Sequence, residues 1–247
     1  MYDYLLGGKD NYAADRVAAE AALRVYPEMA FTARANRAFL GRVVRYLAGE
    51  AGIRQFLDIG TGIPAAGNTH EVAQAVAPDC RIVYVDHDPV VLAHARALLT
   101  SGDHGATDYI DADLRDTRAI LDQAAHTLDF SRPVAVMLLS ILHAIGDDDD
   151  PFGIVAKLVD AVPPGSYLAL SHMGSDILGQ TGPELRDVGR RLSHQQYSYR
   201  SHSEISRFFD GMDLVEPGLV QVEKWRPTAQ IQSGGQSALW GAVARKR

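Results

Sequence analysis

The fold of this chain is decided by the run FLDIGTGIPAAGN, residues 56–68. A short apolar segment leads into a turn that contains three glycines, and a helical pattern follows the turn. Glycine lets the backbone turn tightly and approach a ligand closely. In open α/β sheets, ligands lie beyond the carboxyl ends of the strands, which is where this turn stands. The alternative interpretation is a tight strand-to-helix loop that binds nothing.

The glycine spacing differs from that of a dinucleotide site. Four residues separate Gly62 from the third glycine, where the G-x-G-x-x-G pattern allows two. Pro64 stands inside the turn, and the helix starts late, with Asn68 as its expected N-cap and Glu71 placed to complete a capping box. An acid inside the motif, Asp58, suits a ligand with a cationic end better than a diphosphate. A nicotinamide-dependent oxidoreductase is therefore disfavoured.

Short apolar runs alternate with helical patterns through the rest of the chain. Alternation in units of about 25–30 residues argues for a parallel sheet with helices on both faces. Without a linker or repeat, we expect one domain over residues 1–247, in which residues 1–50 form a helical extension. Strands are expected at 55–59, 81–85, 107–111, 133–139, 167–170, 213–215 and 237–244, and helices at 14–26, 28–50, 68–77, 89–99, 116–125, 151–162, 183–192 and 203–209.

Composition narrows the function classes. Of 247 residues, 47% are apolar and 22% charged, the balance of a globular protein. The lone Cys80 excludes a disulfide framework and a Cys-rich zinc module, and it fits a reducing cytosol. A net charge of −7 without a basic stripe argues against nucleic-acid binding. No signal peptide and no membrane-length apolar stretch is present, so we expect a cytoplasmic protein without a membrane partner.

Acidic residues end the second and third expected strands. Asp86 lies about 20 residues beyond the glycine turn, where a ribose-binding acid is expected, and its carboxylate can accept from both ribose hydroxyls. Asp113 can accept from an adenine amino group, and the backbone N–H of Leu114 can donate to a ring nitrogen. The alternative is that these acids cap helices, as Asp88 before Pro89 is expected to do.

Polar residues also follow the fourth and fifth expected strands. Ser140 and His143 follow the fourth strand, which should lie beside the first, and His172 ends the fifth. The two histidines are candidates for a general base, although a structural histidine is the commoner case. The acidic run 147–150 is interpreted as a solvated loop that caps a helix, and we expect no metal site. Metalloprotease, P-loop and α/β-hydrolase motifs are absent from the sequence.

Together these residues resemble the S-adenosylmethionine-dependent methyltransferases of the seven-stranded Rossmann-like class. The runs YDYLLGGKDNY (2–12), ARANRAF (33–39), FFDGMDLVEPG (208–218) and WRP (225–227) are similar to a family of uncharacterised actinobacterial S-adenosyl methyltransferases. The likeness covers nearly the whole chain. It implies S-adenosyl-L-methionine as cofactor and a doubly wound α/β fold with sheet order 3-2-1-4-5-7-6, mostly parallel, with the last strand antiparallel.

The resemblance also implies roles for individual residues. Pro64 departs from the class, in which a third glycine is common at that position. The implied cofactor contacts are Gly60, Thr61 and Gly62 under the methionine part, Asp86 at the ribose, His87 against the adenine, Asp113 and Leu114 at the adenine edge, and Ser140 near the sulfonium end.

The first residues are a feature of that family alone. We expect residues 1–12 to fold over the crevice as a lid, because Gly7 and Gly8 suggest a turn. Arg34 or Asn11 would bind the cofactor carboxylate, because the rest of the motif supplies no cation. The alternative is a helix pair that merely packs on the sheet.

The expected reaction is methyl transfer to an unidentified acceptor, most simply a small molecule, by a monomer or homodimer. A base such as His143 or His172 is needed only if the acceptor must lose a proton. No N-P-P-Y-type sequence follows the fourth strand, which disfavours methylation of DNA bases. The tyrosines of the segment 195–200 either form an aromatic wall for the acceptor or pack under the helices. A protein that binds S-adenosylmethionine as a sensor or partner-binding module, without turnover, would carry the same glycine turn.

Overall fold

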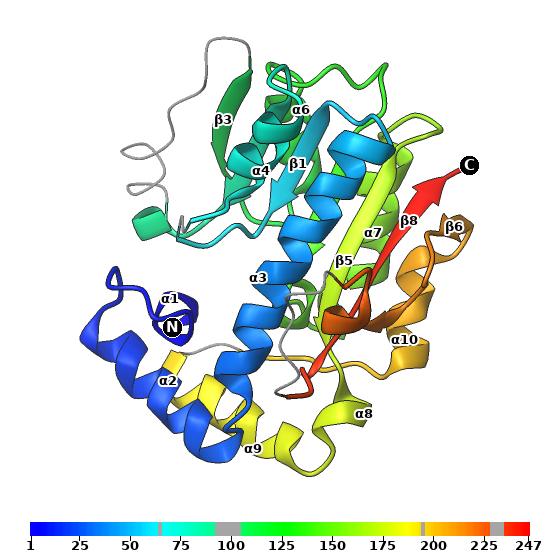
Figure 1. Ribbon diagram of the computed structural model, residues 1–247. Coiled ribbons are helices and arrows are strands. Elements are labelled where there is room, and N and C mark those ends of the chain that lie inside the picture. Colours follow the sequence, from blue (N-terminus) through cyan, green and yellow to red (C-terminus); the bar gives the residue numbers. More distant parts are fainter. Residues whose placement is uncertain (64–65, 92–104, 194–195, 228–234) are drawn as a thin grey trace.

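The computed structural model describes residues 1–63, 66–91, 105–193, 196–227 and 235–247 (Figure 1). Pro64, Gln195 and most of the helix expected over residues 89–99 lie outside the described residues.

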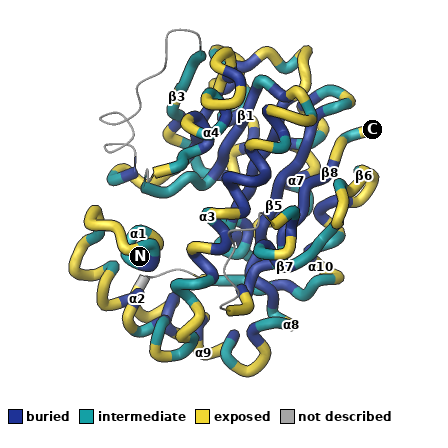
Figure 2. Tube along the Cα trace, in the orientation of Figure 1, coloured by how far each residue is buried: buried dark blue, intermediate teal, exposed yellow. Residues whose placement is uncertain are grey.

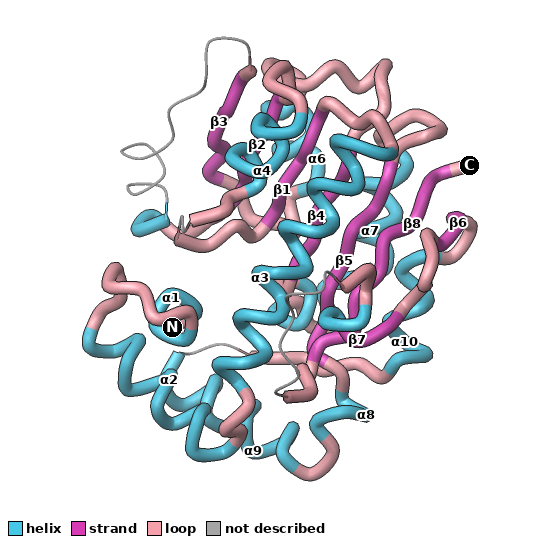
Figure 3. The backbone as a smooth tube through the Cα atoms, viewed as in Figure 1, coloured by secondary structure: helices cyan, strands magenta, loops and turns pink. Residues whose placement is uncertain are grey.

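The described strands form one sheet in the order β3-β2-β1-β4-β5-β8-β6, which confirms the expected order (Figure 3). Neighbouring strands from β3 to β5 pair in parallel, and β8 is antiparallel to both β5 and β6. A two-residue strand, β7, also pairs with β8 and was not expected. The strands are β1 (Gln55–Ile59), β2 (Arg81–Asp86), β3 (Ala106–Asp111), β4 (Ala135–Leu139), β5 (Tyr167–Met173), β6 (Met212–Leu214), β7 (Val220–Gln221) and β8 (Leu239–Lys246).

The central strands are buried along their whole length because helices cover both faces of the sheet. Every residue of β1, β4 and β5 is buried, as Figure 2 shows. Asp58 is the one carboxylate in these three strands, and it pairs in register with Met137 of β4 and Tyr84 of β2. This register brings the carboxyl ends of β1, β2 and β4 to the same edge.

The helices match the apolar periodicities of the sequence within a few residues. Asp116 and Asp150 cap the helices that follow them, as expected for acids at helix starts. The α-helices are α1 (Tyr2–Leu5), α2 (Ala13–Val25), α3 (Met29–Arg45), α4 (Thr69–Val76), α6 (Thr117–Ala124), α7 (Pro151–Asp160), α8 (Ser175–Leu178), α9 (Thr181–Val188) and α10 (His202–Ser206). The remaining turns are π-helical in η1 (Tyr46–Glu50) and η4 (Gly189–Ser193) and 3₁₀ in η2 (Leu142–Ala144), η3 (Asp147–Asp149), η5 (Arg207–Phe209) and η6 (Val222–Lys224).

Two apolar layers enclose the sheet. On one face, Phe39 and Val43 of α3 pack with Phe56 and Trp225. On the other face, α6, α7 and η5 cover alternate strand residues such as Leu57. Successive residues of a strand point to opposite faces of the sheet, so each strand contributes to both apolar layers, as a doubly wound fold requires.

Helices precede the first strand, as expected; α1 and α2 lie at one end of the sheet, and α3 runs along its face (Figure 1). A small apolar cluster of Leu5, Ala19 and Ala33 joins α1, α2 and α3. Helix α2 also packs against α9 and η4. Within the described residues, no helix has both the length and the apolar character needed to cross a membrane.

Candidate active site

A cavity of about 290 Å³ opens at the carboxyl ends of β1 and β4. This volume is near the lower end of the roughly 300–1,000 Å³ typical of ligand sites. The position is where an open α/β sheet binds its ligand. Among the expected site residues, those that line the cavity are Gly60, Thr61, Gly62, Ser140 and His143.

The glycine turn has the backbone conformation that its sequence suggests. Gly60 and Gly62 have φ angles of +77° and +63°, in the left-handed region that favours glycine. The Gly60 N–H donates to the Val85 carbonyl at 2.8 Å. A Cβ atom on Gly60 would lie 2.5 Å from Cγ1 of Ile141. The turn therefore passes too close to the β4 loop for any side chain at Gly60.

Asp86 ties the glycine turn to the end of β2. Its carboxylate accepts from the Gly62 N–H at 2.9 Å and from the Asp88 N–H at 3.0 Å. An ionised carboxylate has about four acceptor positions, so capacity for a ligand hydroxyl remains. Neither Asp86 nor the exposed His87 lines the cavity. The expected ribose and adenine contacts of these two residues stay predictions.

Asp113 and Leu114 follow β3, which β2 separates from the strand that leads into the glycine turn. Asp113 accepts from the backbone N–H and from Nη1 of Arg115, both at 2.8 Å. The Leu114 side chain is buried in the core. Neither residue lines the cavity, and the expected reading of an adenine edge stays a prediction.

One buried acid and one arginine face the cavity together. Asp58 is 6% exposed and accepts from Oγ1 of Thr69 at 2.6 Å. Burial raises the pKa of the Asp58 carboxyl to about 6. Arg37 of α3 lines the same cavity and donates to the Ala66 carbonyl at 3.1 Å and to Oδ1 of Asn68 at 2.7 Å.

Arg37 was missed by the sequence analysis, which named Arg34 and Asn11 as the cations or donors. Arg34 is exposed, and Asn11 donates to Asp3 at 2.8 Å, so neither lines the cavity. The spacing of residues along the helix could have identified Arg37. Arg37 stands four residues after Ala33 and three before Leu40, both buried, so it shares their face of α3.

The expected capping box at Asn68 is wrong. Asn68 occupies the N-cap position of α4, but its side chain makes no capping hydrogen bond. Its Oδ1 accepts from the Arg37 guanidinium, a charged and therefore stronger donor than a backbone amide. Glu71 accepts from the Gly67 N–H at 2.8 Å, one residue before the expected position.

His143 lies at the boundary of the cavity after β4. Its ring centroid is 5.5 Å from that of Tyr197. Nδ1 is buried and has no hydrogen-bond partner among the described residues. Burial, and then the charge of Arg200, lowers the pKa of His143 to about 4, so the ring is neutral at pH 7. Ser140, with φ +60°, starts the loop that carries His143.

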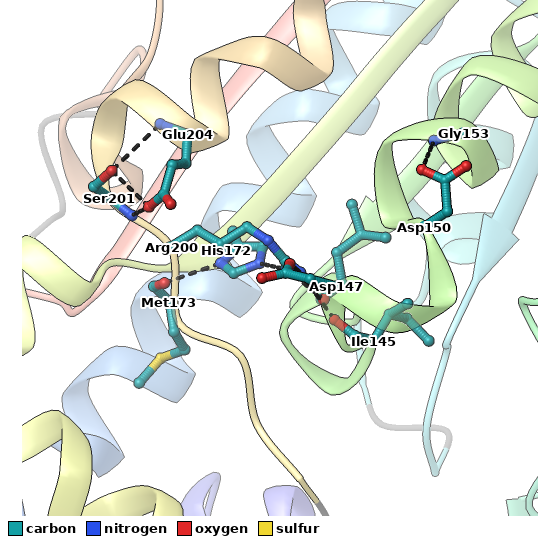
Figure 4. A network of polar contacts seen from close by, with 10 residues as sticks. Ile145, Asp147, Asp150, Gly153, His172, Met173, Arg200, Ser201 and Glu204 are labelled. Carbon is teal, nitrogen blue, oxygen red and sulfur yellow. Dashed lines mark hydrogen bonds and ion pairs between the residues drawn. The ribbon is translucent and has the colours of Figure 1, made fainter.

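His172 is fully buried and lies outside the cavity lining. Nη1 of Arg200 donates to its Nε2 at 3.0 Å, and its Nδ1–H donates to the Met173 carbonyl at 2.9 Å (Figure 4). Both contacts suit a neutral ring, and burial lowers the pKa of His172 to about 3. This geometry makes His172 a partner of Arg200.

Arg200 connects His172 to the loop after β4. Its guanidinium donates to the carbonyls of Leu142 at 3.1 Å and Ile145 at 3.0 Å, and to Asp147 at 2.6 Å (Figure 4). Because Leu142 precedes His143 and Ile145 follows it, these bonds fix the backbone on both sides of His143. His172 therefore supports His143 through Arg200.

Two stacked tyrosine pairs lie at the site, and of their four members Tyr84, Tyr109 and Tyr197 line the cavity. Tyr84 and Tyr109 occupy paired positions on β2 and β3, and their rings stack at 6.1 Å. The hydroxyl of Tyr109 bonds to Oγ1 of Thr61 at 2.8 Å. Tyr197 and Tyr199 also stack at 6.1 Å, with an interplanar angle of 11°. The sequence analysis missed the pair of Tyr84 and Tyr109. Each tyrosine stands two residues before the acid that ends its strand, and this equal spacing could have indicated that they are neighbours.

Comparisons with known proteins agree with this geometry. The model of a family described as S-adenosyl methyltransferase matches residues 1–247. A DUF574 family protein from Streptomyces avermitilis is 46% identical, with a TM-score of 0.96 over 100% of this chain and 95% of that chain. A methyltransferase-like protein from Thermobifida fusca is 42% identical, with a TM-score of 0.90 over 100% and 93% of the two chains.

More distant structures share the fold. The N-methyltransferase NodS from Bradyrhizobium japonicum, solved with S-adenosyl-L-homocysteine, has 16% identity and a TM-score of 0.52 over 87% of each chain. No curated protein matches this sequence.

Proposed function

The chain belongs to the S-adenosyl methyltransferase family, and we propose that it transfers the methyl group of S-adenosylmethionine to a small molecule held beside His143. It is an S-adenosylmethionine-dependent methyltransferase by family and by sheet order. One observation supports the assignment of the site. A single cavity joins the glycine turn, a buried carboxylate, a guanidinium and a neutral histidine.

The charges of the cavity fit the methionine end of the cofactor, which carries an ammonium and a carboxylate. Asp58 is the acid that would meet the ammonium, and Arg37 is the cation that would meet the carboxylate. A guanidinium can donate to both oxygens of a carboxylate, and the bonds of Arg37 to Ala66 and Asn68 hold its guanidinium at the cavity wall. Arg37 thus takes the role expected of Arg34 or Asn11.

The rest of the cofactor site follows from the sequence predictions. The backbone of the turn at Gly60, Thr61 and Gly62 allows close approach by the cofactor. Asp86 would accept from the ribose hydroxyls, beside the turn that it already holds. His87, Asp113, Leu114 and Ser140 remain the proposed contacts of the adenine and of the sulfonium end.

The first residues support the idea of a lid over this cavity. Met1 and Tyr2 both line it. The Tyr2 hydroxyl donates to the Ala33 carbonyl at 3.0 Å and accepts from Nδ2 of Asn36 at 3.3 Å. These bonds anchor residues 1–12 on α3, beside the glycine turn.

For methyl transfer the protein has to position the two reactants, exclude water and accept a proton where the acceptor loses one. Bound S-adenosylmethionine supplies an electrophilic methyl group on a sulfonium. The residues of the cavity position the acceptor and exclude water. His143, neutral at physiological pH, can accept the proton of the acceptor, while His172 and Arg200 fix the loop that carries it.

Calorimetric binding tests this site. S-adenosylmethionine and S-adenosylhomocysteine should bind and NAD should not. Arg37→Met should weaken binding of the adenosyl pair by roughly ten- to a hundredfold, the range of a hydrogen bond to a charged group. Arg34→Met, an exposed arginine one turn away on the same helix, is the matched control and should bind as the wild type does. NAD binding, or equal affinities for the two variants, would refute the assignment.

A further inference from the structure

A second, smaller cavity of about 90 Å³ adjoins the first. Five residues line both cavities: Met1, Tyr2, Ser140, His143 and Tyr197. These residues form a neck between the two spaces, and His143 stands in it. A ligand in the second cavity would therefore reach His143, which also lines the cavity of the glycine turn.

The walls of the second cavity are apolar. They come from α2, α3 and α9, through side chains such as Ala22, Ala33, Leu185 and Val188. In the described part of the chain, no Asp, Glu, Lys or Arg side chain lines this space, and the terminal ammonium of Met1 is paired with Asp15 at 2.7 Å. A charged group placed there would lose its water and gain no partner, which is unfavourable. The occupant of this cavity should therefore be uncharged.

An aromatic wall faces this space. Tyr197 and Tyr199 line it with stacked rings, and His143 packs against Tyr197. Burial raises the pKa of both tyrosines, so they stay uncharged. Flat aromatic surfaces favour an aromatic partner through offset and edge-to-face contacts.

Size limits the occupant further. A cavity of roughly 150 Å³ is enough to hold a benzene ring. The second cavity is smaller than this, at about 90 Å³, so a single ring already extends into the neck and a fused pair of rings exceeds the cavity. Resting on the function proposed above, we propose that the second cavity binds the methyl acceptor, an uncharged single-ring phenol whose hydroxyl lies in the neck against His143.

A phenol also suits the base. Nδ1 of His143 is buried without a partner among the described residues, which leaves Nε2 as the nitrogen available to a ligand. With its pKa lowered to about 4, His143 is a weak base. A phenolic hydroxyl, with a pKa of about 10, gives up its proton far more readily than an aliphatic alcohol. The neutral ring carries its own proton on Nδ1 in this arrangement.

The transfer step balances without a further reactant. The phenol oxygen forms a bond to the methyl carbon while the bond from that carbon to the cofactor sulfur breaks, and the electron pair of the broken bond stays on sulfur. The phenol proton passes to Nε2 of His143 and then to solvent. The products are a methyl aryl ether, S-adenosylhomocysteine and a proton.

The test is calorimetric binding to the full chain saturated with S-adenosylhomocysteine. The probes are 4-methylphenol, 4-hydroxybenzoate and 4-methylbenzylamine. We expect 4-methylphenol to bind about tenfold or more tightly than the two charged probes, because no charged side chain among the described lining residues can pair with them. S-adenosylhomocysteine binding without 4-methylphenol binding would overturn this proposal and leave the proposed function intact. Failure of S-adenosylhomocysteine to bind would overturn the proposed function itself.

Two variants locate the probe. Val188→Phe fills the second cavity only, so S-adenosylhomocysteine should bind as before while 4-methylphenol binds about tenfold or more weakly. Val17→Phe is the control, because Val17 is 53% exposed and lines neither cavity. Leu185→Ala enlarges the same cavity and should admit 2-naphthol, which the wild type excludes. Unchanged 4-methylphenol binding by Val188→Phe, or exclusion of 2-naphthol by Leu185→Ala, would overturn the proposal.

Discussion

Replacing Asp58 by Asn should stabilise the free protein and weaken its hold on the cofactor. Asp58 is 6% exposed in β1, and burial raises its pKa from 3.8 to about 6. The Asn side chain keeps an oxygen that can accept from Thr69, so the main change is the loss of a buried charge.

The pKa shift sets the size of the effect on stability. The gap of about two pKa units corresponds to about 3 kcal/mol at 1.36 kcal/mol per unit. Because the folded pKa lies above the unfolded one, the penalty is absent below pH 3.8 and complete above about pH 6. Asp58→Asn should therefore raise the free energy of unfolding by about 3 kcal/mol at pH 8 and by about 1.5 kcal/mol at pH 5.

The effect on the cofactor has the opposite sign. A hydrogen bond to a charged group contributes about 1.5–3 kcal/mol, so losing the contact between Asp58 and the cofactor ammonium should weaken binding by roughly ten- to a hundredfold. If Asp58 only supported the fold, its replacement would not raise the stability of the free protein and weaken cofactor binding at the same time.

The assays are urea unfolding followed by circular dichroism at pH 8 and pH 5, and calorimetric titration with S-adenosylhomocysteine at pH 8. Asp122→Asn is the control, because the Asp122 carboxylate is 72% exposed and pairs with the exposed Arg118. An equal stability difference between wild type and Asp58→Asn at the two pH values would refute the raised pKa. Unchanged affinity for S-adenosylhomocysteine would refute the contact with the ammonium.

Substitutions at three further positions test the positioning of the site. His172, with its pKa lowered from 6.5 to about 3, takes up a proton only in the unfolded chain between those values, so the wild type should lose about 2 kcal/mol more than His172→Gln between pH 8 and pH 5 in urea unfolding. Parallel pH dependences would contradict a neutral buried ring. Gly60→Ala places a methyl group against Ile141 at a positive φ, and should lower stability by roughly 1–3 kcal/mol and weaken S-adenosylhomocysteine binding in calorimetry. Normal binding would show that the turn can move aside. At Ser140, with φ +60°, Val should lower the melting temperature and Gly should keep or raise it, and the reverse order would argue against backbone strain.

Much of the fold could be predicted because its signals are local. The strand over residues 55–59 has the expected bounds, and the glycines of the turn adopt the positive φ angles that their type allows. The alternation of strands and helices indicates a parallel sheet, and the resemblance implies its strand order. Short elements such as α8 and β7 were missed, because four or two residues are too few to show a periodicity.

The candidate site was only partly predictable. Ser140 and His143 meet the glycine turn because adjacent parallel strands end at the same edge. Arg37 was missed in favour of Arg34, although its helical spacing from the buried Ala33 and Leu40 could have indicated it. The part played by His172 depends on Arg200, which lies 28 residues further along the chain.

The sequence by itself determined the elements, the turn that begins the cofactor site and the acids at the strand ends, because backbone geometry and apolar periodicity act over a few residues. Only the tertiary structure decided which side chains share a cavity. Ser171 bonds to Asn36 across 135 residues of chain, and Arg42 holds the backbone of Trp225 across 183. Such pairs form when helices close over the sheet and buried polar groups must find partners there, and no local pattern encodes which partners those are.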